Sequence, residues 1–440
     1  MVRVGRQRNA RRIETIRKTA FYLTLLLVFI RCCQIHELIY YRFHINTYAV
    51  IVVGAPATLG LIISKSFIRP FRLPQAYCWL GFSLWMVITV PFSFWKGGSI
   101  QVVGDYWRTD AVMFLLIGGL TTTWEEFERL IEVLAISCLL CLVMIKAYGE
   151  LDINGRTTLP FGALANSNDY AAHLLMLLPS VLWVALTSKS LLMRIITICV
   201  IGYGIFAVLS SGSRGALISV AIGTLYFLIM ASRRQRLVAA CLMAIMLFAT
   251  MTVLPKAAVQ RLLSFSRTED ASEEAMESSD IRKRVLEEGI SRTLENPIFG
   301  LGPGNFSNFE GVSEAANWAP PHNSYITVAS ECGIPGFLLF VSGVVLSFRT
   351  MMRIGFKFRR KPEQSKIAQA AICMQLMMVM FCVAVAFLNF AYSFHFPFLV
   401  GTSIAMAYTS LGPRSPSRAH TRVRSLDGRE GNAEMGYLSV

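Results

Sequence analysis

One histidine of this chain stands in a segment that fixes its position. His322 lies in the run PPHNSYITVASECGIPG, where two prolines precede it, an apolar helix is expected from Tyr325, and a Gly-Ile-Pro-Gly break follows. Histidine is the side chain whose ordinary pKa makes it a proton acceptor near neutral pH. His322 is therefore the leading candidate for a general base. A histidine that only caps a helix fits the same pattern, and His395 is the competing candidate.

Arginines stand at the ends of apolar segments and in the loops beside them. Arg214 occupies the small-residue run SSGSRGAL, Arg156 lies just before a turn-rich segment, and Arg282 and Arg284 fall on an expected loop helix. A guanidinium is costly to bury in an apolar setting, and its planar fork matches phosphate oxygens. The alternatives without a binding role are that Arg214 snorkels to the membrane interface and that Arg282 and Arg284 lie on a solvated helix face. Together these residues suggest an anionic group held by arginines beside one base.

Other kinds of site have little support. The turn GLGPGN at 300–305 can cradle a phosphate with its backbone N–H groups, but a simple turn is the more common explanation. The chain has no GxxxxGK[ST] pattern, so ATP-driven transport is not expected. No Asp-x-Asp pair and no CxxC motif with a partner histidine occurs, so we expect neither a metal nor another cofactor.

The composition is that of a membrane protein. Of 440 residues, 54% are hydrophobic and only 16% are charged, whereas an average soluble domain is about a quarter charged. This supply of apolar residues suits about ten to twelve helical spans and excludes an outer-membrane barrel, whose strands alternate in polarity. The net charge of +15 would suggest nucleic acid in a soluble chain. In a membrane chain it reflects cytoplasmic Lys and Arg, so we expect membrane lipids and no nucleic acid as partners.

The apolar runs predict an all-α polytopic protein with about twelve transmembrane helices. The predicted spans are 19–37, 45–64, 75–93, 108–122, 127–147, 167–187, 191–209, 214–231, 236–254, 331–348, 367–391 and 394–411.

The basic residues predict the orientation of these spans. A basic N-terminal tail in the cytoplasm places most Lys and Arg of the short connections on the same side, with both termini cytoplasmic. The predicted organisation is a cytoplasmic tail at 1–18, nine spans in 19–254, a large periplasmic loop at 255–330, three spans in 331–411 and a disordered cytoplasmic tail at 412–440.

Two of the outer connections are unusual. One, at 148–168, is rich in Gly and Asn, and the other, at 255–322, is much longer than compact connections usually are. The longer one opens with an acidic, mobile stretch. Ser279 or Asp280 would then cap a helix that continues to about Glu295. Its apolar stripe is predicted to comprise Ile281, Val285, Ile290 and Leu294.

Four segments resemble the O-antigen ligase and polymerase superfamily, and they occur in its order. PHNSYITVASECGIPGFLLF (321–340) is similar to the signature that begins with His-Asn-Ser and ends with Glu-x-Gly-Ile-x-Gly. RTTLPFGALANSNDYAAHLL (156–175) and SSGSRGAL (210–217) resemble its outer-loop and Ser-Arg-Gly-Ala motifs. RKRVLEEGISRTLENPIFGLGPGNF (282–306) resembles its arginine-led loop helix. Ile326 and Val285 stand where the family more often has leucine and an aromatic residue.

This resemblance implies a metal-independent, inverting glycosyltransferase of the bacterial inner membrane with a periplasmic active site. Its donor would be a glycan on undecaprenyl diphosphate. His322 matches the family's general base, Arg214 and Arg282 match the arginines that hold the diphosphate, and Arg156 is a further candidate by position. The accessory candidates are Arg284, Asn168, Asn323 and Tyr325.

Three activities share these motifs and differ in the acceptor that receives the glycan. A ligase would use a lipid A core sugar, a polymerase another lipid-linked glycan, and a protein O-oligosaccharyltransferase a protein hydroxyl. We favour the ligase type, because one loop carries both the arginine and the histidine signatures. The alternative from another class is a transporter of lipid-linked glycans, but such proteins carry charges deep within several spans, and here most predicted spans have none at mid-depth.

The orientation gives a first testable prediction. A reporter enzyme that is active only in the periplasm should be active when fused near Glu273, because the basic connections keep the opposite side in the cytoplasm. A fusion at the C-terminus is the matched control and should be inactive. Activity of a cytoplasm-only reporter near Glu273 would contradict this orientation.

Overall fold

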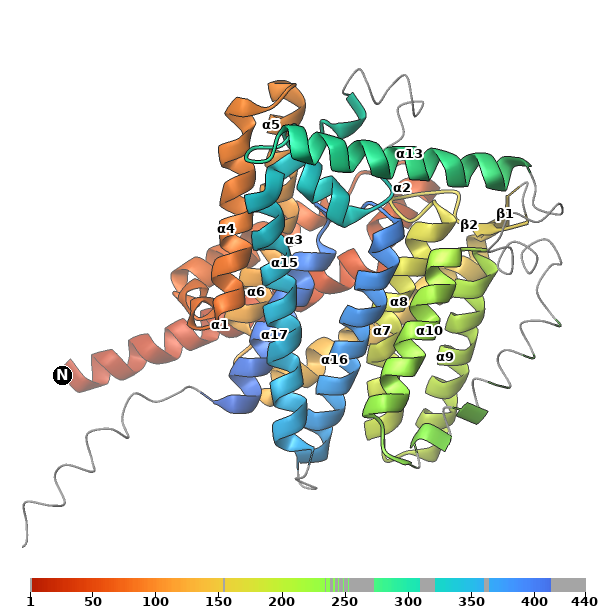
Figure 1. The fold of residues 1–440 in the computed structure, drawn as a ribbon. Coiled ribbons are helices and arrows are strands. Elements are labelled where there is room, and N and C mark those ends of the chain that lie inside the picture. Colours follow the sequence, from red (N-terminus) through yellow and green to blue (C-terminus); the bar gives the residue numbers. More distant parts are fainter. Residues whose placement is uncertain are drawn as a thin grey trace, which may run out of the picture.

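In the computed structural model, the protein is an almost wholly helical bundle (Figure 1). The structure describes residues 2–152, 155–233, 273–308, 321–359 and 364–412, with scattered positions between 235 and 252. The helices are α1 (Val2–Cys33), α2 (Ile35–Phe43), α3 (Ala49–Ile63), α4 (Pro74–Thr89), α5 (Lys96–Asp105), α6 (Met113–Leu120), α7 (Trp124–Tyr148), α8 (Ser167–Thr187), α9 (Leu191–Ser210), α10 (Arg214–Met230), α13 (Glu273–Glu295), α15 (Ser324–Phe358), α16 (Ser365–Ala384) and α17 (His395–Leu411).

Short elements connect these helices. They are the 3₁₀ turns η1 (Ser66–Ile68), η2 (Pro70–Arg72), η3 (Val90–Phe92), η5 (Phe306–Asn308) and η7 (Val385–Phe387), the π-helical turn η4 (Tyr106–Asp110), and the antiparallel strands β1 (Glu150–Leu151) and β2 (Thr157–Thr158).

Six helices among the described residues are long and apolar enough to cross a membrane, and two bent helix pairs raise this number to eight. The predicted all-helical polytopic fold is confirmed, whereas the count of twelve spans stays a prediction. The predicted span at 236–254 falls largely outside the described residues. The run at 108–122 is no continuous helix, because the π-helical turn η4 precedes an α6 of only eight residues.

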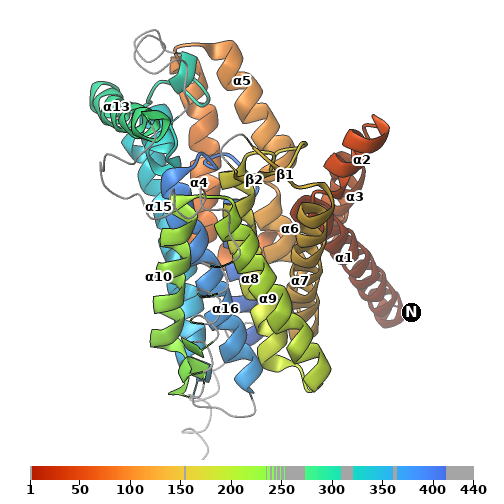
Figure 2. The same cartoon turned by 90° about the vertical axis from the view of Figure 1, so that its right-hand side faces the viewer.

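The α13 helix lies across one end of the bundle, whereas most of the other long helices run side by side along it (Figure 1). Figure 2 shows α13 nearly along its axis, at the periphery above α15. The C-terminal end of α17 lies at the opposite end, and the N-terminal part of α1 extends away from the bundle. The end that carries α13 is called the α13 end below.

Glycines allow α6 and α17 to pack closely against each other. A Cβ atom on Gly118 of α6 would lie 2.8 Å from Cγ2 of Ile404, and one on Gly401 of α17 would lie 2.9 Å from Cα of Phe114. Because lipid tails are as apolar as the side chains, helices in membranes associate through such close packing and through hydrogen bonds. These glycines therefore set how closely α6 and α17 approach.

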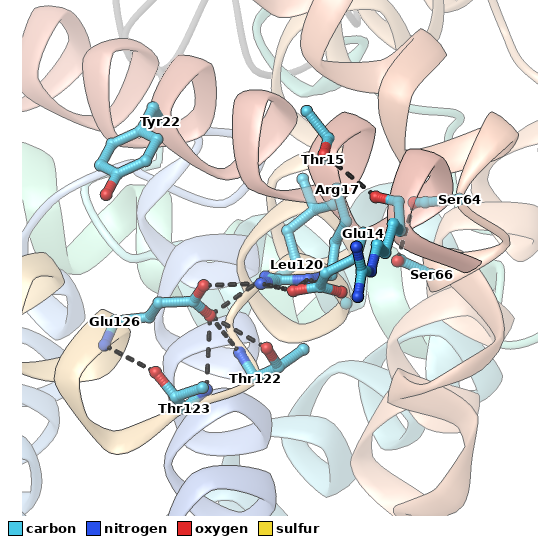
Figure 3. Close-up of polar contacts among 12 residues, drawn as sticks. Glu14, Thr15, Arg17, Tyr22, Ser64, Ser66, Leu120, Thr122, Thr123 and Glu126 are labelled. Atoms are coloured by element: carbon cyan, nitrogen blue, oxygen red, sulfur yellow. Dashed lines mark hydrogen bonds and ion pairs between the residues drawn. The ribbon is translucent and has the colours of Figure 1, made fainter. Parts of the chain in front are cut away.

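Arg17 of α1 is buried in a cluster of charged and backbone groups (Figure 3). Its guanidinium donates to both carboxylate oxygens of Glu126, at 2.8 and 3.1 Å, to the carbonyl of Leu120 at 2.6 Å and to Glu14. Glu126 also forms a capping box with Thr123 at the start of α7. The basic N-terminal segment is thus helical from Val2, and at least one of its arginines joins α1 to α7.

Arg17→Met should destabilise the protein by about 3–5 kcal/mol, because the Glu126 carboxylate would remain buried without its cation. The midpoint of thermal unfolding in detergent, followed by loss of the monodisperse gel-filtration peak, measures this effect. Lys18→Met is the matched control, because Lys18 is exposed on the same helix. Equal midpoints for the two variants would show that the cluster does not hold the bundle together.

Candidate active site

The candidate residues meet at the α13 end of the bundle. The N-terminal ends of α8, α10 and α15 all lie there (Figure 1), and each begins close to one of the predicted motifs. Asn168 is in the first turn of α8, Arg214 is the first residue of α10, and His322 precedes α15 by two residues. Segments that are far apart in the sequence therefore contribute side chains to one region.

Arg156 contacts the turn that leads into α10. Its Nε donates to the carbonyl of Ser211 at 2.7 Å, and its Nη2 donates to Oδ1 of Asn168 at 2.9 Å. Gly212 has a φ of +63°, which favours glycine, and a Cβ there would lie 3.3 Å from Cγ of Arg156. The structure thus brings Arg156 and Asn168 together, and it uses Arg156 to hold the turn before Arg214.

Arg214 begins α10 behind a capped N-terminus. The side chain of Ser213 accepts the backbone N–H of Ala216 at 3.3 Å, and Arg214 itself is half-buried. The next residue, Gly215, packs on the ring of Phe387 in η7, where an added Cβ would lie 2.9 Å from a ring carbon. Arg214 is therefore adjacent to the segment that joins α16 to α17.

His322 is half-buried just before α15, and its neighbours fix the start of that helix. Oδ1 of Asn323 accepts the backbone N–H groups of Tyr325 and Ile326, at 3.0 and 3.2 Å, as an N-cap. The hydroxyl of Tyr325 donates to the carbonyl of Cys382 at 2.9 Å. Of the predicted accessory residues, Asn323 and Tyr325 therefore have structural roles that position the histidine.

Ser324 joins His322 to the same segment that Arg214 approaches. Its hydroxyl donates to the carbonyl of Leu388 at 2.8 Å and accepts the backbone N–H of Phe390 at 2.8 Å. Residues 387–390 thus lie between the start of α10 and the start of α15. Sequence reasoning missed this connection, because nothing in residues 387–390 distinguishes them from any other end of a span.

The glycine-rich turn after α13 binds a carboxylate of the protein itself through backbone hydrogen bonds. The backbone N–H groups of Gly304 and Phe306 donate to Oε2 and Oε1 of Glu331, at 2.7 and 3.0 Å. Leu301 and Gly302 donate to the carbonyls of Ser330 and Glu331. Three amides of the turn 300–305, those of Leu301, Gly302 and Gly304, are thus bonded within the protein, which agrees with the favoured explanation of a simple turn and not with a phosphate cradle.

Glu331, the glutamate of the Glu-x-Gly-Ile-x-Gly motif, has a structural role that the sequence analysis did not predict. It stands inside an apolar stretch of α15, is buried, and connects the turn after α13 to the helix after His322. A charged residue within a predicted span is itself a signal, because burying a carboxylate in a membrane protein needs a specific reason. Here the reason is the pair of buried N–H groups that it accepts.

The loop helix is longer than predicted and exposes part of its apolar face. α13 begins at Glu273 rather than at Ser279 or Asp280, so the predicted cap is wrong. Val285 is buried, and Gly289 packs against Ile326, whereas Ile290 and Leu294 are exposed. The helix therefore packs on the start of α15 at Gly289, with Val285 buried one turn earlier.

The structure describes the side chain of Arg284 but not that of Arg282. The side chains of Ile281 and Arg282 lie outside the described residues. Of the acidic stretch predicted to be mobile, Glu269 and Asp270 also lie outside them, whereas Glu273, Glu274 and Glu277 belong to α13, so the prediction is wrong for these three. Arg284 is exposed on α13, as expected for a solvated helix face. The backbone of α13 still carries Arg282 at the α13 end of the bundle, on the helix that packs against α15.

His395, the competing candidate for the base, is buried away from solvent. Its Nε2 lies 2.9 Å from Nδ1 of His173, whose Nε2 lies 2.7 Å from the carbonyl of Cys32. The hydroxyl of Ser393 is 3.0 Å from the other nitrogen of His395. Both imidazoles are thus used in a hydrogen-bonded chain that joins α1, α8 and α17, and His395 is poorly placed to meet a substrate.

Metal ligands do not gather in the described part of the chain. No group of three or more His, Cys, Asp or Glu side chains there could hold a metal ion. Arg156 and Arg214 are the described arginines among the candidate residues at this end of the bundle, and His322 is the candidate proton acceptor. The arrangement can therefore supply positive charge and a proton acceptor from the protein's own side chains.

Residues 199–341 match the sequence model of a protein family described as O-antigen ligase. The matched stretch contains Arg214, Arg282, the glycine turn, His322 and Glu331, while Arg156 and α1–α8 lie outside it. A search of curated proteins gives no match to the chain.

Glu331→Gln should destabilise the protein by about 1–3 kcal/mol, because the new NH₂ group would face a backbone N–H that has lost its acceptor. Glu287→Gln is the matched control on the exposed side of α13. Thermal unfolding in detergent gives the comparison, and limited proteolysis near residue 300 reports whether the turn has opened. Unchanged unfolding and proteolysis of Glu331→Gln would mean that the carboxylate does not fix the turn.

Proposed function

Because residues 199–341 match the sequence model of the O-antigen ligase family, we propose that the chain belongs to the O-antigen ligase and polymerase superfamily and catalyses a specific reaction. The protein transfers a glycan from undecaprenyl diphosphate to an acceptor hydroxyl at the membrane surface. One observation carries the proposal. Arg214 and His322 stand at the starts of two helices that contact the same short segment, residues 387–390, through Gly215 and Ser324.

His322 acts as the general base in this reaction. It takes the proton from the acceptor hydroxyl as the hydroxyl oxygen attacks the anomeric carbon of the donor sugar. The bond between that carbon and the diphosphate oxygen breaks, and its electron pair leaves with the lipid diphosphate. A single in-line displacement of this kind inverts the anomeric centre.

Arginines stabilise the leaving diphosphate. Arg214 and Arg282 donate charge-assisted hydrogen bonds to its oxygens, which gain negative charge as the bond breaks. Arg156, with Nε and Nη2 donating to Ser211 and Asn168, holds the turn that aims Arg214. Arg156 thus contributes to diphosphate binding indirectly, by positioning Arg214.

The acceptor is a lipid A core sugar, which makes the enzyme a ligase. The location in this proposal is the bacterial inner membrane, with the site in the periplasm and both termini in the cytoplasm. A purified-enzyme assay that offers the donor with a core lipid A, with a second lipid-linked glycan or with a peptide hydroxyl separates ligase from polymerase and from protein glycosylation. Transfer to either of the other acceptors alone would replace the ligase assignment.

His322→Ala and Arg214→Ala should fail in different ways. His322→Ala is expected to lower turnover about 10²-fold or more while leaving donor-lipid binding nearly intact. Arg214→Ala should weaken donor binding as well, since each charge-assisted bond to phosphate is worth roughly 1.5–3 kcal/mol. Arg214→Lys should recover only part of this loss, because an ammonium keeps the charge without the fork.

The measurements are transfer rates and lipid-diphosphate binding, with folding checked by gel filtration. Arg194→Ala is the matched control, because Arg194 is exposed at the start of α9, at the end of the bundle away from α13. A well-folded His322→Ala protein that turns over like the wild type would refute the assignment of the base. Normal donor binding by Arg214→Ala would refute the assignment of the diphosphate site.

EDTA should leave the transfer rate unchanged, because arginines supply the positive charge at the leaving group. The control is the same assay with added Mg²⁺, which should give an equal rate. Loss of transfer on chelation, restored by Mg²⁺, would show that a metal carries part of this role.

A further inference from the structure

The α13 helix has three different faces among its described side chains. Val285 and Gly289 face the bundle. Glu288 and Arg292 form an ion pair at 2.6 Å on a polar face, which Glu295 extends with a 2.7 Å contact to the same arginine. Between these two faces runs an exposed apolar stripe with a spacing of four residues, which keeps its members on one side of a helix. The stripe consists of Leu286, Ile290 and Leu294.

This stripe is strongly exposed. Ile290 is 47% and Leu294 70% accessible, and Ile298, in the turn after the helix, is 56% accessible. A helix that packs on protein with one face and meets water with the rest has no reason to carry large apolar side chains beside its packed face. A third environment at that flank would explain them.

The apolar stripe continues into the lipid-facing surface of the spanning helices. The backbone N–H of Ile334 in α15 donates to the carbonyl of Pro297 at 2.8 Å, next to Ile298. Phe299 stacks on Phe92, which ends the candidate span that α4 begins, with ring centroids 3.9 Å apart. Ile334 and Phe92 are exposed, like the outward residues further along their helices, namely Leu84, Ile88, Leu338 and Val345.

Aromatic side chains mark the level of this junction. Phe92, Phe94 and Trp95 are all more than half exposed, and the backbone N–H of Phe94 donates to the carbonyl of Leu301 at 2.9 Å. Exposed aromatic residues at the ends of spans are typical of the boundary between acyl chains and headgroups. The loop with its glycine turn is thus attached at the depth where such a boundary would lie.

We propose that α13 lies in the plane of the membrane, with Leu286, Ile290, Leu294 and Ile298 inserted among the lipids at the edge of the outer leaflet. The orientation of the helix fits this occupant, because α13 lies across the spanning helices at the periphery of the bundle (Figures 1 and 2). Its packed face rests on α15, its apolar flank meets lipid, and its polar face meets water. Insertion of about 5–10 Å is usual for such helices.

Membrane insertion of α13 has a consequence that rests on the proposed function. Arg282 is carried by the same helix, so insertion would hold it at the level of the headgroups, where the diphosphate of a lipid-linked donor lies. The lipid contact itself does not depend on the transfer reaction. An experiment can therefore refute the lipid contact without refuting the transfer reaction, and the reverse.

Site-specific photo-crosslinking of the full chain tests the lipid contact. The variant Leu294→p-benzoylphenylalanine is purified, reconstituted into nanodiscs of phosphatidylethanolamine and phosphatidylglycerol, and irradiated. Mass spectrometry should then detect a phospholipid adduct in a yield similar to that of Leu338→p-benzoylphenylalanine in the lipid-facing part of α15. The same substitution at Ile290 gives a second reading if the first variant folds poorly.

Glu295→p-benzoylphenylalanine is the matched control, because Glu295 is exposed on the polar face of α13. The lipid adduct at position 294 should exceed that of the control several-fold. A yield no higher than that of the control would overturn the proposal, and so would a crosslink from position 294 to a second copy of the chain in place of lipid. Because no donor or acceptor is present, loss of the transferase assignment would leave this result unchanged.

Discussion

The carboxylate of Glu331 accepts two backbone N–H groups, those of Gly304 and Phe306, in a part of the bundle from which solvent is excluded. Backbone groups that are removed from water need partners within the protein, and in a membrane the penalty for leaving them unpaired is severe. The tight turn after α13 is therefore stabilised by the carboxylate of Glu331. Through this contact the arginine-bearing loop and the helix that follows His322 become one unit.

Around this unit, the site is assembled from the ends of helices rather than from their middles. Asn323 and Ser213 cap α15 and α10, so that His322 and Arg214 start from defined backbone positions. Residues 387–390 then fix the distance between the two helix starts. Such an arrangement suits chemistry on a lipid-linked substrate, because polar groups gather at the membrane surface while the helix bodies remain apolar.

Polar side chains deeper in the bundle join helices to one another. The His173 and His395 pair joins α8 to α17, Arg31 pairs with Asp110 of η4, and Arg17 joins α1 to α7. Each has specific polar partners, which buried polar groups require. These contacts give the helix packing a fixed register that apolar packing alone does not guarantee in lipid, and they leave His322 as the histidine that is half-buried at the candidate site.

Composition and apolar runs determined that the chain is a helical membrane protein, because burial in lipid demands long apolar segments whatever their order in space. The sequence also pointed to Arg156, Arg214, Asn168 and His322, since unusual polar residues at the ends of spans stand out from an apolar background. It did not reveal that the glycine turn binds Glu331, that His395 is buried, or that Ile290 and Leu294 are exposed. Those outcomes depend on which helices pack together. A hydrogen-bond acceptor 27 residues away, or a neighbour that covers one flank of a helix and not the other, exists only in the tertiary structure.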